Sequence, residues 1–156
     1  MQSDSLSFED FTTGRVFMLG PVSMTREDVI EFAQEFDPQP MHLDEEAGKA
    51  SILGGLAASG WHTAAISMRM MFDSFVARST SQGSPGIERL EWKKPVLVGD
   101  TLTGRATVTG ARLLRSRPGL GIAQFENEIE NQRGELVCRS AYSIIFAVET
   151  APRSAA

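Results

Sequence analysis

The residues best suited to chemistry lie in one short segment rich in proline, residues 36–44, which reads FDPQPMHLD. It carries a carboxylate, Asp37, and an imidazole, His42, five residues apart. Because prolines restrict the backbone, the two side chains can be held in one geometry. Such a pair could hold a water molecule and move protons to and from it. The same spacing also fits a helix-terminating turn with a structural histidine, so both interpretations stay open.

A second candidate segment is the glycine-rich run LGGLAASGWH at residues 53–62. Gly60 is expected at the start of a long helix, where the first backbone N–H groups lack partners. A carbonyl oxygen placed there would be stabilised as negative charge develops on it, as in an oxyanion hole. Alternatively, the glycines only permit tight packing of the backbone.

Other kinds of site are not indicated. The chain has no G-x-G-x-x-G after a strand and no phosphate-binding Gly-Lys-Ser/Thr loop. Ser59 lacks the G-x-S-x-G context of a hydrolase nucleophile. His42, Asp44, Glu45 and His62 lack a recurrent metal-ligand spacing. We therefore predict neither a metal site nor a redox cofactor.

Composition suits one soluble domain, predicted over residues 1–156 with a core at about 8–148 and loose polar ends. The net charge of −5 and the absence of a basic run argue against a nucleic-acid partner. The single cysteine, Cys138, and an N-terminus without signal-peptide features fit the cytoplasm. Residues 50–68 carry no formal charge, but their three glycines favour a buried loop and core helix over a membrane span.

Two helices are expected after a first strand at residues 8–17. Thr25 and Asp28 have the spacing of a capping box that opens the first helix, and Asp37-Pro38 ends it. Its inward side chains should be Val29, Phe32, Ala33 and Phe36. After a turn-rich segment to residue 50, a second helix should span about residues 60–78. Its predicted buried stripe is Trp61, Ala64, Ala65, Met68, Phe72, Phe75 and Val76.

Beyond residue 86 the hydrophobic period changes to two, which is typical of half-buried strands. The expected inward positions include Leu90, Trp92, Leu102, Gly104, Ala106, Val108, Ala123, Phe125 and Ile129. Residues 132–135 read as a hairpin turn, and residues 136–148 as a central last strand. The order of one strand, helices and then four strands predicts an α+β fold, an antiparallel sheet wrapped around one long helix.

These segments together resemble the MaoC-like (R)-specific enoyl-CoA hydratases. The family pattern D-x-N-P-x-H-x-D stands here at residues 37–44, and its glycine-rich loop at residues 54–60. The resemblance continues through LEWKKPVLVGDT at residues 90–101 and NQRGELV at residues 131–137, and covers about residues 8–148. It implies a hotdog fold and a homodimer, or a higher homo-oligomer, formed through the sheet edge.

The resemblance also implies a reaction, namely addition of water to a trans-2-enoyl-CoA thioester or its reverse. Asp37 and His42 would be the catalytic pair that holds the water. Gly60, together with Ser59, would bind the thioester oxygen, and Gln39 and Pro40 would orient the loop. No cofactor is implied beyond the coenzyme A of the substrate.

Two positions depart from the family pattern, because Gln39 replaces the usual Asn and Ser59 replaces the usual His. Because of these two departures, the resemblance does not identify the acyl group of the substrate. Branched, dicarboxylic and β-hydroxyacyl thioesters are among the options. One alternative function is a hotdog thioesterase, whose catalytic acid would have to be Asp73. Another is a non-catalytic acyl-CoA-binding module. Candidate cations for the CoA phosphates, each of which could instead be a solvated surface charge, are Lys93, Lys94, Arg112, Arg115 and Arg117.

Overall fold

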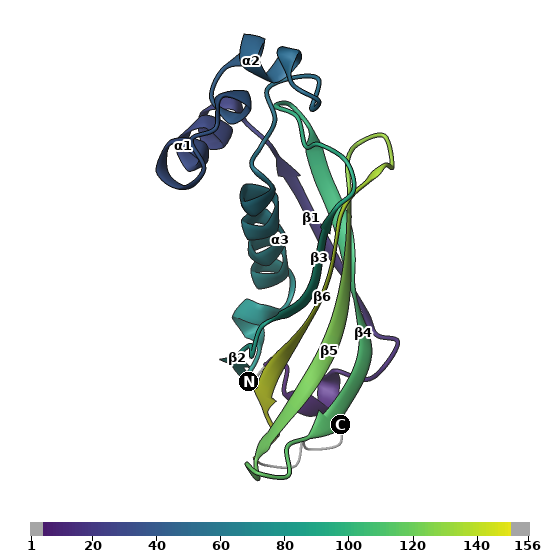
Figure 1. Ribbon diagram of the computed structural model, residues 1–156. Coiled ribbons are helices and arrows are strands. Elements are labelled where there is room, and N and C mark those ends of the chain that lie inside the picture. The colour runs from purple at the N-terminus through teal and green to yellow at the C-terminus, as the bar shows by residue number, and fades with distance from the viewer. Residues whose placement is uncertain (1–4, 151–156) are drawn as a thin grey trace.

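The protein folds as one antiparallel sheet that curves around a single long helix, as the computed structural model of residues 5–150 shows (Figure 1). The helices and strands are η1 (Phe8–Asp10), β1 (Val16–Ser23), α1 (Arg26–Phe36), η2 (Pro40–His42), α2 (Glu45–Ala50), α3 (Gly60–Ser74), η3 (Val76–Arg78), β2 (Ser81–Gly83), β3 (Ile87–Trp92), β4 (Thr101–Leu113), β5 (Leu120–Glu130) and β6 (Leu136–Ala147). The sheet order is β1-β4-β5-β6, and both β2 and β3 pair with β6. The predicted α+β hotdog architecture is confirmed.

The strand pattern after residue 86 is confirmed on β4 and β5. It is wrong on β3, which lies at the edge of the sheet, because Trp92 was predicted to face inward but is 47 % exposed and Leu90 is only partly buried. Leu102, Ala106 and Val108 on β4 are buried, and Ala123, Phe125 and Ile129 on β5 face the same core. The β5–β6 hairpin turns at Gly134, which has a φ of 72° that favours glycine. β6 lies inside the sheet, between β5 on one side and β2 with β3 on the other.

The beginning of the chain differs from the prediction. Residues 8–17 are not one strand, because η1 occupies Phe8–Asp10 and β1 begins only at Val16. Phe11 enters the core and its ring stacks on Phe146 at 3.9 Å between centroids. Leu6 is buried as well, so the polar N-terminal end is shorter than expected. The rest of the two predicted loose ends, residues 1–4 and 151–156, lies outside the described residues.

The first helix begins and ends where predicted. The Thr25 side chain accepts a hydrogen bond from the backbone N–H of Asp28, and Asp37 is the C-cap. Val29 and Ala33 are fully buried, but Phe36 is 65 % exposed and packs on Phe32. The segment expected to consist of turns also contains α2, whose N-cap Asp44 accepts from the Ala47 N–H.

The long helix begins at Gly60 as predicted, but its predicted buried stripe is wrong apart from Phe75 and the partly buried Ala64 and Val76. Trp61, Met68 and Phe72 are 59, 46 and 46 % exposed, and Ala65 is exposed too. The buried face consists instead of His62, Thr63, Ser67, Met70 and Met71. Apolar residues occur on all sides of this helix, so their spacing does not select the face that meets the sheet.

Candidate active site

Asp37 and His42 meet at the end of the molecule where α1, η2 and the start of α3 converge. Asp37 Oδ2 lies 3.5 Å from His42 Nε2. The side chain of His42 is 7 % exposed and that of Asp37 is 18 % exposed. Pro40 begins the short η2 helix, which brings His42 back toward the C-cap of α1. The structure thus places the two side chains together, as their spacing in the proline-rich segment predicts.

The proton on His42 is determined by its other contact. His42 Nδ1 lies 2.8 Å from the carbonyl oxygen of Ala57, which can only accept a hydrogen bond. Nδ1 must therefore carry a hydrogen, so in the neutral ring Nε2 is an acceptor. Nε2 and the carboxylate of Asp37 then present two neighbouring acceptors. A water molecule between them could donate one hydrogen to each.

Two side chains hold the carboxylate of Asp37. The Ser59 hydroxyl donates to Oδ2 at 2.6 Å, and the Gln39 amide donates to Oδ1 at 2.8 Å. These two hydrogen bonds, with that of Ser59 the stronger influence, lower the pKa of Asp37 below its usual range. Asp37 is therefore a carboxylate at neutral pH and can accept a proton. Gln39 keeps a loop-orienting contact despite its extra methylene.

Ser59 has a different place from the one expected. It is fully buried, it is the N-cap of α3, and its hydroxyl is committed to Asp37. It also accepts a hydrogen bond from the backbone N–H of Trp61. Ser59 therefore positions Asp37 relative to the start of α3, and it is not among the residues that line the neighbouring cavity.

Gly60 is the first residue of α3, and no described residue accepts a hydrogen bond from its N–H. A Cβ atom at this position would lie 2.5 Å from Cε2 of Trp92, so only glycine fits against that ring. The Trp92 indole donates through Nε1 to the Gly60 carbonyl oxygen at 2.8 Å. Trp92 was not among the expected site residues, although it stands in the sequence passage that resembles the MaoC-like family.

His42, Gly60 and Trp92 line the same cavity, which has a volume of about 430 Å³. Its other lining residues include Thr63, Ala57, Pro95, Lys93 and Lys94. Close packing is one role of the glycine-rich run, because Gly48 lies so near Gly55 that a Cβ on Gly48 would lie 2.3 Å from the Gly55 oxygen. The oxyanion-hole role of Gly60 stays a prediction.

The predicted cations divide into two groups. Lys93 and Lys94 line the cavity, but each is paired with an acid, Glu91 and Glu135 respectively. Arg112, Arg115 and Arg117 are exposed at the opposite end of the sheet, around the β4–β5 hairpin (Figure 1). Arg112 lies eleven residues along β4 from Thr101, or roughly 35 Å at the rise of a strand. Within one chain these arginines do not reach the site.

Asp73, the acid required by the thioesterase alternative, is also remote. It lies thirteen residues beyond Gly60 on α3, or roughly 20 Å along the helix axis. Its carboxylate is exposed and accepts hydrogen bonds from Arg69. The structure does not bring it to the cavity.

His62 lies on the buried face of α3, beside the site. Its ring stacks on Phe32 of α1 at 4.7 Å between centroids, and its Nδ1 has no hydrogen-bond partner among the described residues. Burial lowers the pKa of His62, and the charge of Asp28 opposes this only in part. The native state therefore resists a proton that the unfolded chain accepts.

We expect this burial to make the protein less stable in mild acid. Because the folded pKa of His62 lies below its unfolded value of about 6.5, the free energy of unfolding should fall as pH drops below that value. Urea unfolding at about pH 7 and about pH 5 would measure the slope, and His62→Phe, which keeps a ring on Phe32, should reduce it. Asp37 contributes only near pH 4 and below, where its unfolded form protonates. The His62→Phe variant still contains His42. If the free energy of unfolding depended on pH as strongly in this variant as in the wild type, His62 would not be the cause.

Among residues 5–150, no helix is long and apolar enough to cross a membrane.

Comparison with known proteins shows the family of this chain. Residues 10–127 match the MaoC-like domain family. A solved MaoC-like dehydratase from Rhodospirillum rubrum is 40 % identical, with a TM-score of 0.86 over 94 % of this chain and all of the other. The uncharacterised protein YdeM of Bacillus subtilis is 32 % identical over 90 % of this chain and 99 % of its own length. An R-hydratase from Pseudomonas aeruginosa shares the fold, with a TM-score of 0.73 at 19 % identity, and the alignment covers 97 % of this chain and 96 % of that one. The chain belongs to the MaoC-like domain family.

Proposed function

We propose that the protein is a hydratase/dehydratase that adds water to the double bond of a trans-2-enoyl-CoA thioester, or removes it in the reverse direction. Membership in the MaoC-like family supports a hydratase or dehydratase activity in general. The observation that carries the specific proposal is the pairing of Asp37 with His42 Nε2, at 3.5 Å, next to a cavity that His42 and Gly60 both line.

In the proposed hydration, a water molecule donates hydrogen bonds to Asp37 and to His42 Nε2. As its oxygen attacks C3 of the enoyl group, the carboxylate takes a proton from it, and the electrons of the double bond move toward the thioester oxygen. That oxygen is stabilised by the Gly60 N–H and by the partial positive charge at the start of α3. The pair then returns a proton to C2. The atoms balance without a further co-reactant, so the proposal includes no cofactor.

The first test is turnover of crotonyl-CoA. We expect the enoyl absorbance to disappear while no free CoA thiol is released. Release of free CoA would instead show a thioesterase, the alternative that the remote position of Asp73 disfavours. Tight binding of acyl-CoA without turnover of crotonyl-CoA or longer enoyl thioesters would support a binding module. The water-holding geometry of Asp37 and His42 favours catalysis over that second alternative.

We also propose a homodimer formed through the β3 edge of the sheet. Ile87 on β3 is 60 % exposed, and the neighbouring stripe on α3 exposes Trp61, Met68 and Phe72. Exposed apolar side chains near an edge of β3 that pairs with no other described strand favour pairing with a second copy. Light scattering should report twice the mass of one chain. A monomer at micromolar concentration would contradict the proposal.

A further inference from the structure

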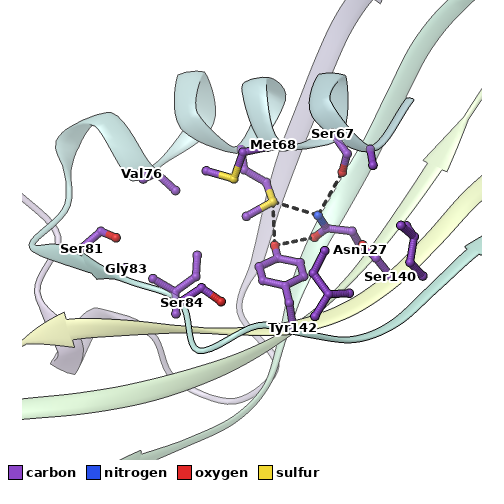
Figure 2. A pocket seen from close by; sticks show the side chains of 14 residues that line it. Ser67, Met68, Val76, Ser81, Gly83, Ser84, Asn127, Ser140 and Tyr142 are labelled. Carbon is purple, nitrogen blue, oxygen red and sulfur yellow. Dashed lines mark hydrogen bonds between the residues drawn. The ribbon is translucent and has the colours of Figure 1, made fainter. Parts of the chain in front are cut away.

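A second cavity, of about 340 Å³, lies between α3 and the strands β2, β3 and β6 (Figure 2). The two cavities are neighbours, because both α3 and β3 contribute lining residues to each of them. On α3, Gly60 and Thr63 line the first cavity, whereas Ala64 and Ser67 line the second. On β3, Trp92 lines the first cavity and Leu90 the second. An acyl chain attached at the first cavity would therefore run toward the second.

The second cavity is lined by apolar side chains and neutral polar ones, and three of the polar side chains form a buried cluster. Asn127 Nδ2 donates to Ser67 Oγ at 3.3 Å, and the Tyr142 hydroxyl lies 2.9 Å from Asn127 Oδ1. Figure 2 shows these three side chains directed toward one another from α3, β5 and β6. Ser81, Ser84 and Ser140 also line the cavity, and no charged residue among residues 5–150 does.

The Asn127 amide and the Tyr142 hydroxyl both contact a weak acceptor. Met71 Sδ lies 2.9 Å from Asn127 Nδ2 and 2.8 Å from the Tyr142 hydroxyl oxygen. A thioether accepts hydrogen bonds poorly, and a methionine side chain adapts its rotamer easily. An oxygen atom that displaced the sulfur would be a better acceptor for the Asn127 N–H that now meets it. The single hydrogen of the Tyr142 hydroxyl could either stay on Asn127 Oδ1 or turn to this oxygen. Burial raises the pKa of Tyr142, so its hydroxyl keeps its proton at physiological pH.

We propose that Asn127 and Tyr142 recognise a neutral oxygen on the distal part of the acyl group, so that the enzyme prefers enoyl thioesters with a hydroxyl or keto group there. This inference rests on the proposed hydratase function. Asn127 and Tyr142 would then determine substrate specificity. The second cavity would bind the distal part of an acyl group that carries a hydroxyl or keto oxygen.

The position of the cluster determines where on the chain that oxygen should be. Ser67 lies seven residues beyond Gly60, or roughly 10 Å along the helix axis. An extended chain advances roughly 1.2 Å per bond, judged from the span of an extended polypeptide. The oxygen should therefore follow the thioester carbon by on the order of eight bonds, which corresponds to the end of a medium-length acyl chain.

The same cavity should reject a carboxylate at that position. A charge moved into an apolar cavity without a cationic partner loses its hydration and gains little in return. Within the described part of the chain, no lysine or arginine lines this cavity. Dicarboxylic thioesters, which the sequence leaves as an option, should therefore be poor substrates at this chain length.

The test compares kcat/KM for three eight-carbon trans-2-enoyl-CoA thioesters, ending in a methyl, a hydroxyl or a carboxylate. The hydroxyl form should exceed the methyl form by about two- to tenfold, the effect of one hydrogen bond. The carboxylate form should fall below the methyl form by at least about a hundredfold. Tyr142→Phe should bring the ratio of hydroxyl to methyl close to one.

Ser143→Ala is the matched control, since it removes a buried hydroxyl from the next residue of β6 that does not line the cavity. It should keep the wild-type ratio. Hydration without preference for the hydroxyl form, or a preference that survives in Tyr142→Phe, overturns the inference and leaves the hydratase proposal standing. If none of the three thioesters or crotonyl-CoA is hydrated, the proposed function falls and the inference falls with it. Should Tyr142→Phe fail to fold, the wild-type ratios alone decide.

Discussion

Asp37→Asn should lower kcat/KM for enoyl-CoA hydration by about a thousandfold, within the range that general acid–base groups contribute. Asparagine keeps the size of the side chain and can still accept the Ser59 hydrogen bond, but it cannot take a proton from water. The loss should therefore appear in turnover and not in folding. Steady-state rates with crotonyl-CoA, together with a urea unfolding curve for each variant, measure the two separately. A variant that keeps a tenth of the wild-type activity would show that Asp37 is not the base.

Ser59→Ala provides a second readout of the same carboxylate. The Ser59 hydroxyl is the largest cause of the lowered pKa of Asp37, so its removal should raise that pKa toward the usual value. Since Asp37 is the proposed base, the acidic limb of the pH–rate profile should move to higher pH. A residue with only a packing role would lower the rate without moving this limb. An unmoved limb would therefore contradict the positioning role of Ser59.

Much of this arrangement could be predicted because its causes are local in the sequence. The helix cap at Thr25, the break at Asp37-Pro38 and the short reach back to His42 depend on neighbouring residues and on proline geometry. The alternation along β4 and β5 reports one buried face, since successive side chains of a strand point to opposite sides. These features placed the catalytic candidates and the fold class.

Other features depend on contacts between distant segments, and there the prediction was wrong or incomplete. Ser59 contacts Asp37 across 22 residues, so its commitment to the carboxylate is visible only in the fold. The face that α3 buries is chosen by the sheet, which accommodates Thr63 and Ser67 and leaves Trp61 exposed. Arg112 was predicted as a candidate for binding the CoA phosphates. The sequence alone does not show that most of β4 separates this residue from the cavity.

Gly60→Ala should lower kcat/KM for the same substrate by about a hundredfold, comparable to the removal of one oxyanion-hole donor. The N–H group remains in this variant, so the loss would come from displacement. The new Cβ would lie 2.5 Å from Trp92 Cε2, a distance that forces the ring or the start of α3 to move. Either movement takes the Gly60 N–H away from its place and strains the hydrogen bond from Trp92 to the Gly60 carbonyl oxygen.

This cause can be tested by removing the obstacle. In the double variant Gly60→Ala/Trp92→Leu the smaller side chain makes room, so about a tenfold recovery over Gly60→Ala is expected, a non-additive effect of two residues in contact. Gly14→Ala is a control for backbone strain alone, because Gly14 has a φ of 92° and an added Cβ would have no atom of residues 5–150 within 4 Å. It should cost about 1 kcal/mol of stability and spare turnover. Wild-type activity of Gly60→Ala would contradict the proposed role of the Gly60 N–H. The added Cβ must displace either the start of α3 or the Trp92 ring, and either displacement should weaken a hydrogen bond from this N–H to the thioester oxygen. Full activity would therefore mean that the start of α3 does not bind that oxygen.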